Sequence, residues 1–251
     1  MSISLQPNNN SDVPESRSSS RPLFLLGRRL SVCAQMVRAG ARLADIGTDH
    51  AYLPVWLALR GDICSAVASD IRPGPLRRAR QNILRYGVSG LVSDRLSDGL
   101  AAVSPEEADD IVIAGMGGKM IAKIIKEAPW LRNPEKHLIL QPMTSVEDLR
   151  LFLAENGFAV LEEHAAEEDG HVYSAMLVVY TPELCRQDAL TPYIGKLTAD
   201  TEESRAYLRR QVRRLSNRAE GLRLAGDLVA SRESACLAEE IKHMLDEIKT
   251  E

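Results

Sequence analysis

Short apolar runs that alternate with segments of helical spacing constrain the fold of this chain more than any other feature. The runs lie at residues 43–46, 66–70, 93–96, 110–114 and 137–141. Between the second and third runs, Leu76, Ala79 and Ile83 recur at helical spacing. Strand, helix and strand in this rhythm predict βαβ units, in which helices cover both faces of a parallel sheet.

The last two apolar runs predict a different connection. Residues 158–162 and 172–180 have the pattern of strands, and the acidic segment Glu167-Glu168-Asp169-Gly170 lies between them. No helix fits in so short a link, so we expect this pair to be antiparallel. An α/β sheet that is parallel and ends in an antiparallel hairpin resembles the fold of class I (Rossmann-like) S-adenosylmethionine-dependent methyltransferases, which is a likeness of architecture alone.

The C-terminal part of the chain has the pattern of two amphipathic helices. Leu208, Val212, Leu215, Ala219 and Leu222 repeat every four and three residues, as do Leu237, Ile241, Met244 and Ile248. We expect an antiparallel, coiled-coil-like helical hairpin with its turn at 226–231. Residues 205–223 hold seven arginines and one acid, and residues 224–251 hold three bases and seven acids. Either the two helices attract each other, or the first presents arginine to phosphate.

These patterns divide the 251 residues into three parts. Residues 1–22 are rich in serine and show no periodicity, which predicts a disordered tail; residues 23–193 hold the sheet and residues 194–251 the helical hairpin. No stretch approaches the ~18 apolar residues of a membrane helix, and no signal-peptide core precedes the sheet. The four cysteines are scattered without a CxxC pair, which indicates reduced thiols in a cytoplasmic protein.

The loop after the first strand has the position of a cofactor site. A glycine turn at the carboxyl end of the first parallel strand is where nucleotide-like ligands bind, and Gly47 stands there. Dinucleotide enzymes carry GxGxxG in this loop, but here Asp49 and His50 replace the further glycines, and acids repel a pyrophosphate. An acidic loop suits a ligand with an ammonium or sulfonium group, such as S-adenosylmethionine. A helix cap by Thr48 or Asp49 explains the same residues without a ligand.

Two further aspartates follow strands of the same sheet. Asp70 ends the second strand, 23 residues after Gly47, where an acid can accept both hydroxyls of a ribose. A ribose is common to NAD and S-adenosylmethionine, so this residue does not separate them. Asp98-Gly99 follows the third strand, where an aspartate can bind an adenine amino group or can form a turn.

Three glycines in four positions follow the fourth strand, in Gly115-Met116-Gly117-Gly118. They imply a close approach of the backbone to a ligand, and their spacing excludes the GxxxxGK loop of nucleotide triphosphatases. The Asn/Asp-Pro-Pro-Tyr-like turn that grips an amino group in adenine-specific methyltransferases is missing, which favours attack by another atom. The histidines show no spacing of metal ligands such as HxxxH, so we expect no metal.

These motifs resemble those of a known family, the bacterial tRNA (adenine-22-N1)-methyltransferases, or TrmK-like family. The string Leu-Ala-Asp-Ile-Gly-Thr-Asp-His-Ala-Tyr-Leu-Pro at residues 43–54 is similar to the family's first motif. Residues 68–76, 95–100, 113–118 and 141–143 and the pair Arg29-Leu30 are similar to further motifs, so the resemblance runs from about residue 23 to the C-terminus. It departs at Glu168-Asp169-Gly170-His171 and Tyr173-Ser174, where the family often has Glu-Asp-Gly-Lys and Tyr-Glu.

The resemblance implies transfer of a methyl group from S-adenosylmethionine to N1 of adenine 22 in tRNA, after the base has left its stack. The donor would contact Arg29, Asp45, Gly47, Thr48, Asp49, His50, Asp70, Ile71, Asp98, Gly99 and Gly115. The reaction would take place in a narrow pocket formed by Gly115, Met116, Gly117 and Gly118. The tRNA phosphates would contact Arg72, Arg77, Arg78, Arg209, Arg210, Arg213 and Arg214. We expect a monomer with tRNA as its partner and no membrane contact.

Three other functions compete with this interpretation. The first is an NAD-dependent oxidoreductase, which the missing glycines disfavour. The second is an RNA-binding module with an inactive methyltransferase fold, which Asp70, Asp98 and the glycine turn disfavour. The third keeps the donor and methylates another RNA or a small molecule. It is the strongest competitor, because the motifs define the donor side better than the acceptor side.

Overall fold

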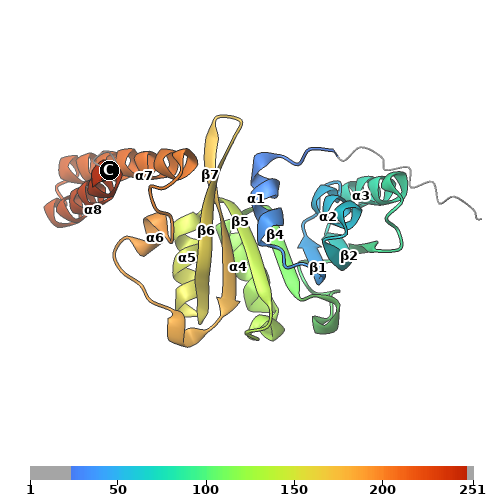
Figure 1. Ribbon diagram of the computed structural model, residues 1–251. Helices are drawn as coiled ribbons and strands as arrows, with labels where there is room; N and C mark the ends of the chain where they lie inside the picture. The colour runs from blue at the N-terminus through green and yellow to red at the C-terminus, as the bar shows by residue number, and fades with distance from the viewer. Residues whose placement is uncertain (1–23, 248–251) are drawn as a thin grey trace, which may run out of the picture.

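The computed structural model describes residues 24–247 and holds a seven-stranded mixed sheet with helices on both faces (Figure 1). The predicted tail at 1–22 and Ile248 of the second helical pattern lie outside the described residues. None of the helices within residues 24–247 is long and apolar enough to cross a membrane.

The order of the strands is β3-β2-β1-β4-β5-β7-β6. Their bounds are β1 Ala41–Ile46, β2 Ile63–Asp70, β3 Val92–Leu96, β4 Asp110–Gly117, β5 His137–Thr144, β6 Phe158–Glu168 and β7 His171–Tyr180. The first five strands are parallel, β7 is antiparallel to β5, and β6 is antiparallel to β7. This confirms the predicted α/β sheet and its antiparallel end.

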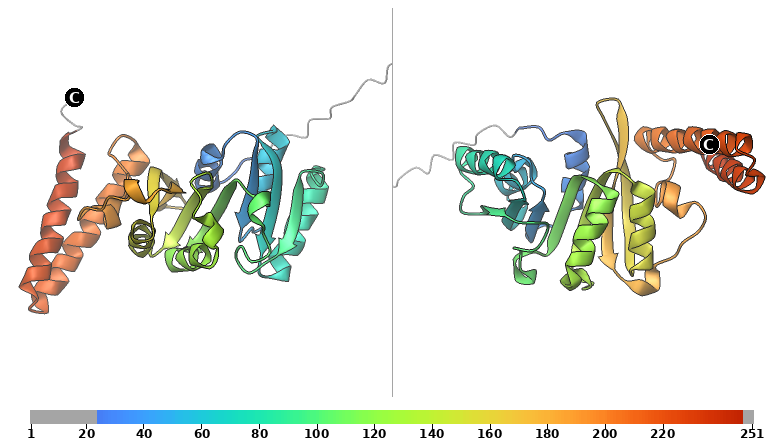
Figure 2. Two further views of the ribbon diagram at one scale, coloured as in Figure 1. Left: turned by 90° about the horizontal axis from the view of Figure 1, so that it is seen from below. Right: turned by 180° about the vertical axis from the view of Figure 1, so that it is seen from behind.

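Two helical layers bury the two faces of the sheet (Figure 2). The helices are α1 Arg28–Met36, α2 Tyr52–Arg60, α3 Pro73–Tyr86, α4 Gly118–Glu127 and α5 Val146–Glu155. Leu43 and Ile139 belong to the core under α1, α2 and α3, whereas Ala44 and Leu138 belong to the core under α4 and α5. Successive residues of a strand therefore serve opposite cores, which is why the strands read as continuous apolar runs.

Three strand ends differ from the sequence prediction. The run 110–114 predicts a strand that stops at Ala114, but β4 continues to Gly117. The run 137–141 stops before Pro142, but β5 continues to Thr144, and Pro142 pairs with Met116 at an irregular register next to β4. A bulge tolerates proline because the ladder there lacks a regular hydrogen bond. Half of the predicted acidic loop 167–170 is strand as well, because β6 runs to Glu168. The hairpin tip therefore lies at Asp169 and Gly170.

The C-terminal helices α7 (Glu202–Leu224) and α8 (Leu228–Glu247) pack as an antiparallel pair that projects from one end of the sheet (Figure 1). Their shared core includes Leu208, Leu215 and Ile241, as the repeat predicts, and also Ala238, which is buried where the repeat has the half-buried Leu237. The turn is shorter than the expected 226–231, because α8 is already helical at Leu228. We call this pair the arm.

A buried ion pair joins the arm to the sheet. Arg150 of α5 donates to Glu163 of β6 at 2.5 Å, and both side chains are buried. Arg150 also donates to the Tyr207 hydroxyl of α7 at 3.2 Å and to the Pro192 carbonyl of the short helix α6 (Thr191–Ile194) at 2.8 Å. Since a buried charge needs all its partners, this cluster fixes where the arm leaves the sheet.

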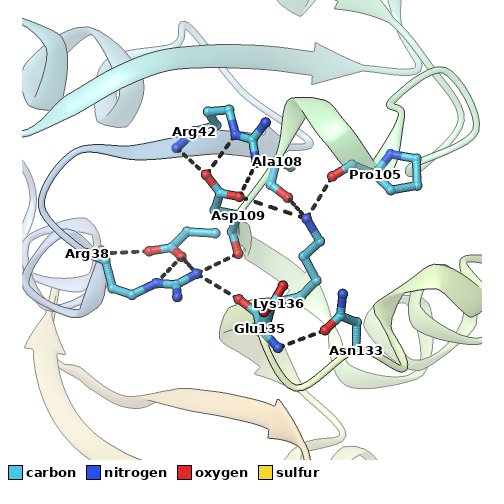
Figure 3. A network of polar contacts seen from close by, with 9 residues as sticks. Arg38, Arg42, Pro105, Ala108, Asp109, Asn133, Glu135 and Lys136 are labelled. Atoms are coloured by element: carbon cyan, nitrogen blue, oxygen red, sulfur yellow. Dashed lines mark hydrogen bonds and ion pairs between the residues drawn. The ribbon is translucent and has the colours of Figure 1, made fainter.

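A second polar network holds the loops at the amino ends of the strands (Figure 3). Arg42 donates to both carboxylate oxygens of Asp109, at 2.8 and 2.5 Å. Arg38 donates to Asp110 at 2.7 Å, and Lys136 donates to the Ala108 carbonyl at 2.7 Å. These side chains bind one another at the amino ends of the strands. A ligand site is therefore expected at the carboxyl ends.

Replacing Asp109 with Asn should destabilise the fold at neutral pH. The hydrogen bonds from Arg42 lower the pKa of Asp109 to about 2, so its contribution is complete above about pH 4 and is lost as the pH falls toward 2. We expect the melting temperature of D109N to fall by roughly 2–6 °C at neutral pH, for a loss of about 1–2 kcal/mol. The gap from the wild type should close in acid. The control is E155Q, which removes the charge of the exposed Glu155 in the same way. An equal fall in melting temperature in D109N and E155Q would contradict this account.

Candidate functional site

The chain leaves β1 and β4 toward opposite faces of the sheet, which opens a crevice at their carboxyl ends. In open α/β sheets this switch in strand order is where ligands bind. A cavity of about 600 Å³ lies there, within the size range of small-molecule sites. Its lining includes the predicted residues Arg29, Asp45, Gly47, Thr48, Asp49, Asp70, Ile71, Asp98, Gly99, Gly115 and Met116. The structure thus brings together residues from five separate segments of the chain.

Asp45 is the most perturbed acid of the cavity. Its side chain is buried at the end of β1 and accepts a hydrogen bond from Thr48 Oγ1 at 2.6 Å. The pKa of Asp45 is raised to about 6, mainly by burial and to a lesser extent by the Asp70 charge, and the Thr48 hydrogen bond partly offsets this rise. A buried carboxylate with one hydrogen-bond donor is a strong acceptor for a cationic ligand.

Asp70 and Asp98 lie farther along the same cavity. Asp70 is buried at the end of β2, and its Oδ1 accepts the Arg72 backbone N–H at 2.7 Å. Within residues 24–247 its Oδ2 accepts no hydrogen bond, so this oxygen is available to a ligand hydroxyl. Asp98 is exposed at the cavity wall, next to a turn that Ser97 fixes by donating to the Gly99 carbonyl at 2.9 Å.

Gly47 is required by its conformation and by the space beside it. Its φ is +75°, a region that favours glycine, and an added Cβ would lie 2.0 Å from Met116 Cε. The Met116 side chain therefore crosses from the β4 turn to the β1 turn. The two glycine turns form opposite walls of one cavity.

The glycine turn predicted at 115–118 is instead the irregular end of β4, which runs to Gly117, and it divides into two parts. Gly115 and Met116 line the cavity, whereas Gly117 and Gly118 do not. A Cβ on Gly118 would lie 2.3 Å from the Ser145 carbonyl oxygen, so this glycine allows α4 to pack against the start of α5. The roles of Gly117 and Gly118 in holding a target base stay predictions, and packing gives Gly118 a reason of its own.

His50 lies behind the cavity wall. Its φ is +68°, its carbonyl accepts a hydrogen bond from Asn82 Nδ2 at 2.9 Å, and its ring stacks on that of Tyr52 at 5.2 Å. Tyr52 lines the cavity, whereas His50 does not. The predicted contact of His50 with a donor stays a prediction. Tyr52 is a residue that sequence reasoning missed, although it stands in the motif at 43–54.

Other lining residues were also missed. They are Leu30, Leu53, Ser97, Met120, Lys123 and Ile124 among others. Met120, Lys123 and Ile124 come from the first turns of α4, and their helical spacing gave no sign that this face meets a ligand. Within residues 24–247 no group of His, Cys, Asp or Glu side chains could hold a metal ion.

The predicted RNA-binding arginines fall into three groups. Arg77 and Arg78 are exposed on α3, and Arg72 lies at the cavity. Arg210 donates to the Val172 carbonyl at 3.0 Å and Arg214 pairs with Glu147, so both hold α7 against the sheet. Arg209 pairs with Glu202, and Arg213 is exposed without an ion pair among the described residues. The exposed stripe of α7 therefore carries Arg209 and Arg213.

A doubly wound sheet with a carboxylate-rich cavity at its switch point defines a Rossmann-like methyltransferase domain. Residues 26–176 match the family model described as a methyltransferase domain. The tRNA (adenine(22)-N(1))-methyltransferase of Bacillus subtilis (strain 168) is 32% identical over 195 residues, which cover 76% of this chain and 82% of the relative. The chain belongs to the tRNA (adenine(22)-N(1))-methyltransferase family.

Solved structures agree with this assignment. The crystal structure of the B. subtilis M1A22 tRNA methyltransferase TrmK is similar with a TM-score of 0.75 and 28% identity, and the match covers 90% of this chain and 99% of that one. M. capricolum TrmK in complex with the cofactor product S-adenosyl-homocysteine gives a TM-score of 0.74 at 25% identity, with 88% and 100% covered. The likeness spans the arm as well as the sheet.

Replacing Asp45 with Asn should stabilise the free protein at neutral pH. Because the pKa of Asp45 is raised to about 6, the folded state binds its proton more tightly than the unfolded chain, and stability falls as the pH rises from about 4 to 6. Asn keeps an acceptor for Thr48 and removes the buried charge. We expect a gain of roughly 5 °C in melting temperature, since two pKa units correspond to at most ~3 kcal/mol.

The gain from D45N should shrink as the pH falls from 6 to 4, and a melting series over that range measures it. The matched control is D49N, because Asp49 lines the same cavity with an exposed side chain. A pH-independent gain, or an equal gain in both variants, would show that burial of the Asp45 charge is not its source.

Proposed function

We propose that this chain transfers the methyl group of S-adenosylmethionine to N1 of adenine 22 in tRNA. The observation that carries the proposal is the convergence of Asp45, Asp70 and Asp98 on one cavity between two glycine turns. The arm that projects from one end of the sheet and the similarity to tRNA (adenine(22)-N(1))-methyltransferases support the acceptor.

The donor set of the cavity fits S-adenosylmethionine. A ligand with cationic ammonium and sulfonium groups suits the buried carboxylate of Asp45, whereas a pyrophosphate would be repelled by it. The free Oδ2 of Asp70 would accept the ribose hydroxyls, and Asp98 would accept the adenine amino group. Arg29, Gly47, Thr48, Asp49, Ile71, Gly99 and Gly115 complete the wall.

Methyl transfer to adenine N1 requires mainly that the protein position the donor and the acceptor. S-adenosylmethionine supplies a methyl group on a positively charged sulfur. Adenine N1 carries a lone pair and no proton at neutral pH, so it could attack the methyl carbon without a general base. The N1–methyl bond would form as the sulfur–methyl bond breaks, S-adenosylhomocysteine would leave as a neutral thioether, and the positive charge would pass to the methylated adenine. The residues of this chain then act by holding donor and acceptor at attack distance, which is worth several kcal/mol in comparable reactions. N1 lies on the base-pairing edge, so the adenine has to leave its stack to enter the cavity.

The acceptor would bind across the length of the molecule. The arm and α3 lie at opposite ends of the sheet, with the carboxyl ends of β1 and β4 between them (Figure 1). The helix α7 has 23 residues and so extends for about 35 Å, which suits contact with several phosphates. Arg72, Arg77 and Arg78 would bind the backbone at one end, and Arg209 and Arg213 at the other. We further propose a monomer in the cytoplasm, where tRNA is present.

A methyl-transfer assay tests the proposal. Unmodified bulk bacterial tRNA is incubated with S-adenosylmethionine and digested, and the nucleosides are identified by mass spectrometry. We expect 1-methyladenosine, and we expect it to fall by two orders of magnitude or more, about 3 kcal/mol, with D70A. D94A is the control, because Asp94 pairs with Arg80 outside the cavity. Donor binding without label in tRNA would favour the competing hypothesis of another RNA or a small-molecule acceptor.

The exposed stripe of α7 gives a separate prediction. R209A/R213A should weaken tRNA binding and reduce its dependence on salt, since each phosphate contact adds to the salt slope. The control R132A/R186A removes the same charge from exposed residues near the amino ends of the strands. We expect a slope lower by about 1–2 in the first variant and an unchanged slope in the second. Equal slopes in the two variants would remove α7 from the RNA interface.

A further inference from the structure

The start of α1 is held by the tip of the β6–β7 hairpin. Glu168 accepts the Arg29 backbone N–H at 3.2 Å and Arg29 Nε at 2.8 Å. Gly27, the residue before α1, provides no side-chain cap, so a carboxylate 139 residues away caps this helix instead. The hairpin tip and α1 lie side by side in Figures 1 and 2.

Gly27 makes room for this contact. A Cβ at Gly27 would lie 2.6 Å from Glu168 Oε2, and the φ of Gly27 is −57°, which any residue can adopt. The backbone therefore does not require glycine here. A Cβ there would instead push the Glu168 carboxylate away from the first turn of α1.

Arg29 is also linked through Gln141 to Gly115, which lines the cavity. Arg29 Nη1 donates to Gln141 Oε1 at 2.6 Å, and the Gly115 backbone N–H donates to the same oxygen at 3.2 Å. Gln141 is buried within β5, and its Nε2 donates to the Pro142 carbonyl at 3.0 Å, which fixes the orientation of the amide. The Arg29 guanidinium also lies 5.5 Å from the centre of the Tyr173 ring.

These contacts form one continuous chain from Glu168 through Arg29 and Gln141 to Gly115, which we call the clamp. It joins the hairpin tip, α1 and β5 to the glycine turn that lines the cavity. Gln141 and Glu168 do not line the cavity themselves. Their effect on a reaction in the cavity would therefore pass through Arg29 and Gly115.

We propose that the clamp positions the acceptor. Glu168, Arg29 and Gln141 hold the backbone at Gly115 in the place where the target base has to meet the methyl group. This inference rests on the proposed function and moves the main role of Arg29 from donor binding to positioning. Displacement of a reacting group by about 1 Å can cost two orders of magnitude in rate, so a clamp of this kind acts on turnover. Donor binding uses the aspartates and is left intact.

The test compares variants that loosen the clamp at different points. They are Gly27→Ala, Glu168→Ala and Gln141→Leu, with Gln141→Glu as the conservative variant that keeps an acceptor for Arg29 and Gly115. We expect kcat on tRNA to fall by about 10- to 100-fold in the first three, with the dissociation constant of S-adenosylhomocysteine changed by less than about threefold. Gln141→Glu should recover turnover in part, because it keeps the acceptor for Arg29 and Gly115 but loses the donor to the Pro142 carbonyl. A purely structural role would lower the melting temperature and both parameters together.

Two controls match the clamp variants. Gly90→Ala adds a Cβ in open space, and Glu167→Ala removes the neighbouring exposed acid of the same hairpin tip. Both should keep wild-type turnover. A double variant Glu168→Ala/Gln141→Leu should lose no more than its worse single parent, because both changes break the same chain of contacts. Additive losses would contradict the clamp.

The free protein gives a readout that does not need tRNA. Amide hydrogen exchange at Gly115 should accelerate in Gly27→Ala and Glu168→Ala as well as in Gln141→Leu, since the Gly115 N–H bonds to Gln141. If the wild type methylates no tRNA, the proposed function fails while this measurement still decides the clamp. Unchanged exchange in Gly27→Ala and Glu168→Ala, or a loss of S-adenosylhomocysteine affinity as large as the loss of turnover, would overturn the inference.

Discussion

The parallel pairing of β1 with both β2 and β4 is the constraint on which the rest of this molecule depends. Its register places Ile46 opposite Ser69 on one side and Ile113 on the other, so β2 ends one residue beyond β1 and the last residues of β4, 114–117, extend past both. Because the connections after β1 and β4 leave toward opposite faces, no helix closes the gap between them. The cavity is a consequence of this topology, and the residues that follow each strand become its wall.

The amino and carboxyl ends of the strands differ in their electrostatics. At the amino ends, acids face bases, as in the contacts of Asp109 with Arg42, and the charges stabilise the fold. At the carboxyl ends, Asp45 and Asp70 line the same cavity, and burial together with the Asp70 charge raises the pKa of Asp45. A buried carboxylate without a cationic partner lowers the stability of the folded protein. The ion pairs at the amino ends of the strands offset part of this loss.

The sequence predicts this architecture well where the information is local. Apolar runs locate the strands, and Asp70 and Asp98 can be placed because the carboxyl ends of parallel strands meet at one edge. Local patterns fail where tertiary packing decides: Pro142 continues a strand at a bulge, and α8 begins at Leu228 inside the expected turn. The clamp joins residues more than 100 positions apart, so no motif reveals that Arg29 meets Gln141 and Glu168. Arginine repeats likewise do not show which side chains, such as Arg214, are already paired.

The position of the methyl group in a single tRNA is the most direct test of the account. A tRNA transcript with adenine at position 22 is treated with the protein and S-adenosylmethionine, and reverse transcription locates any 1-methyladenosine as a stop, next to a transcript with guanine at that position. The account predicts one stop at position 22 in the first transcript and none in the second. Stops at another adenine, or equal methylation of both transcripts, would contradict it.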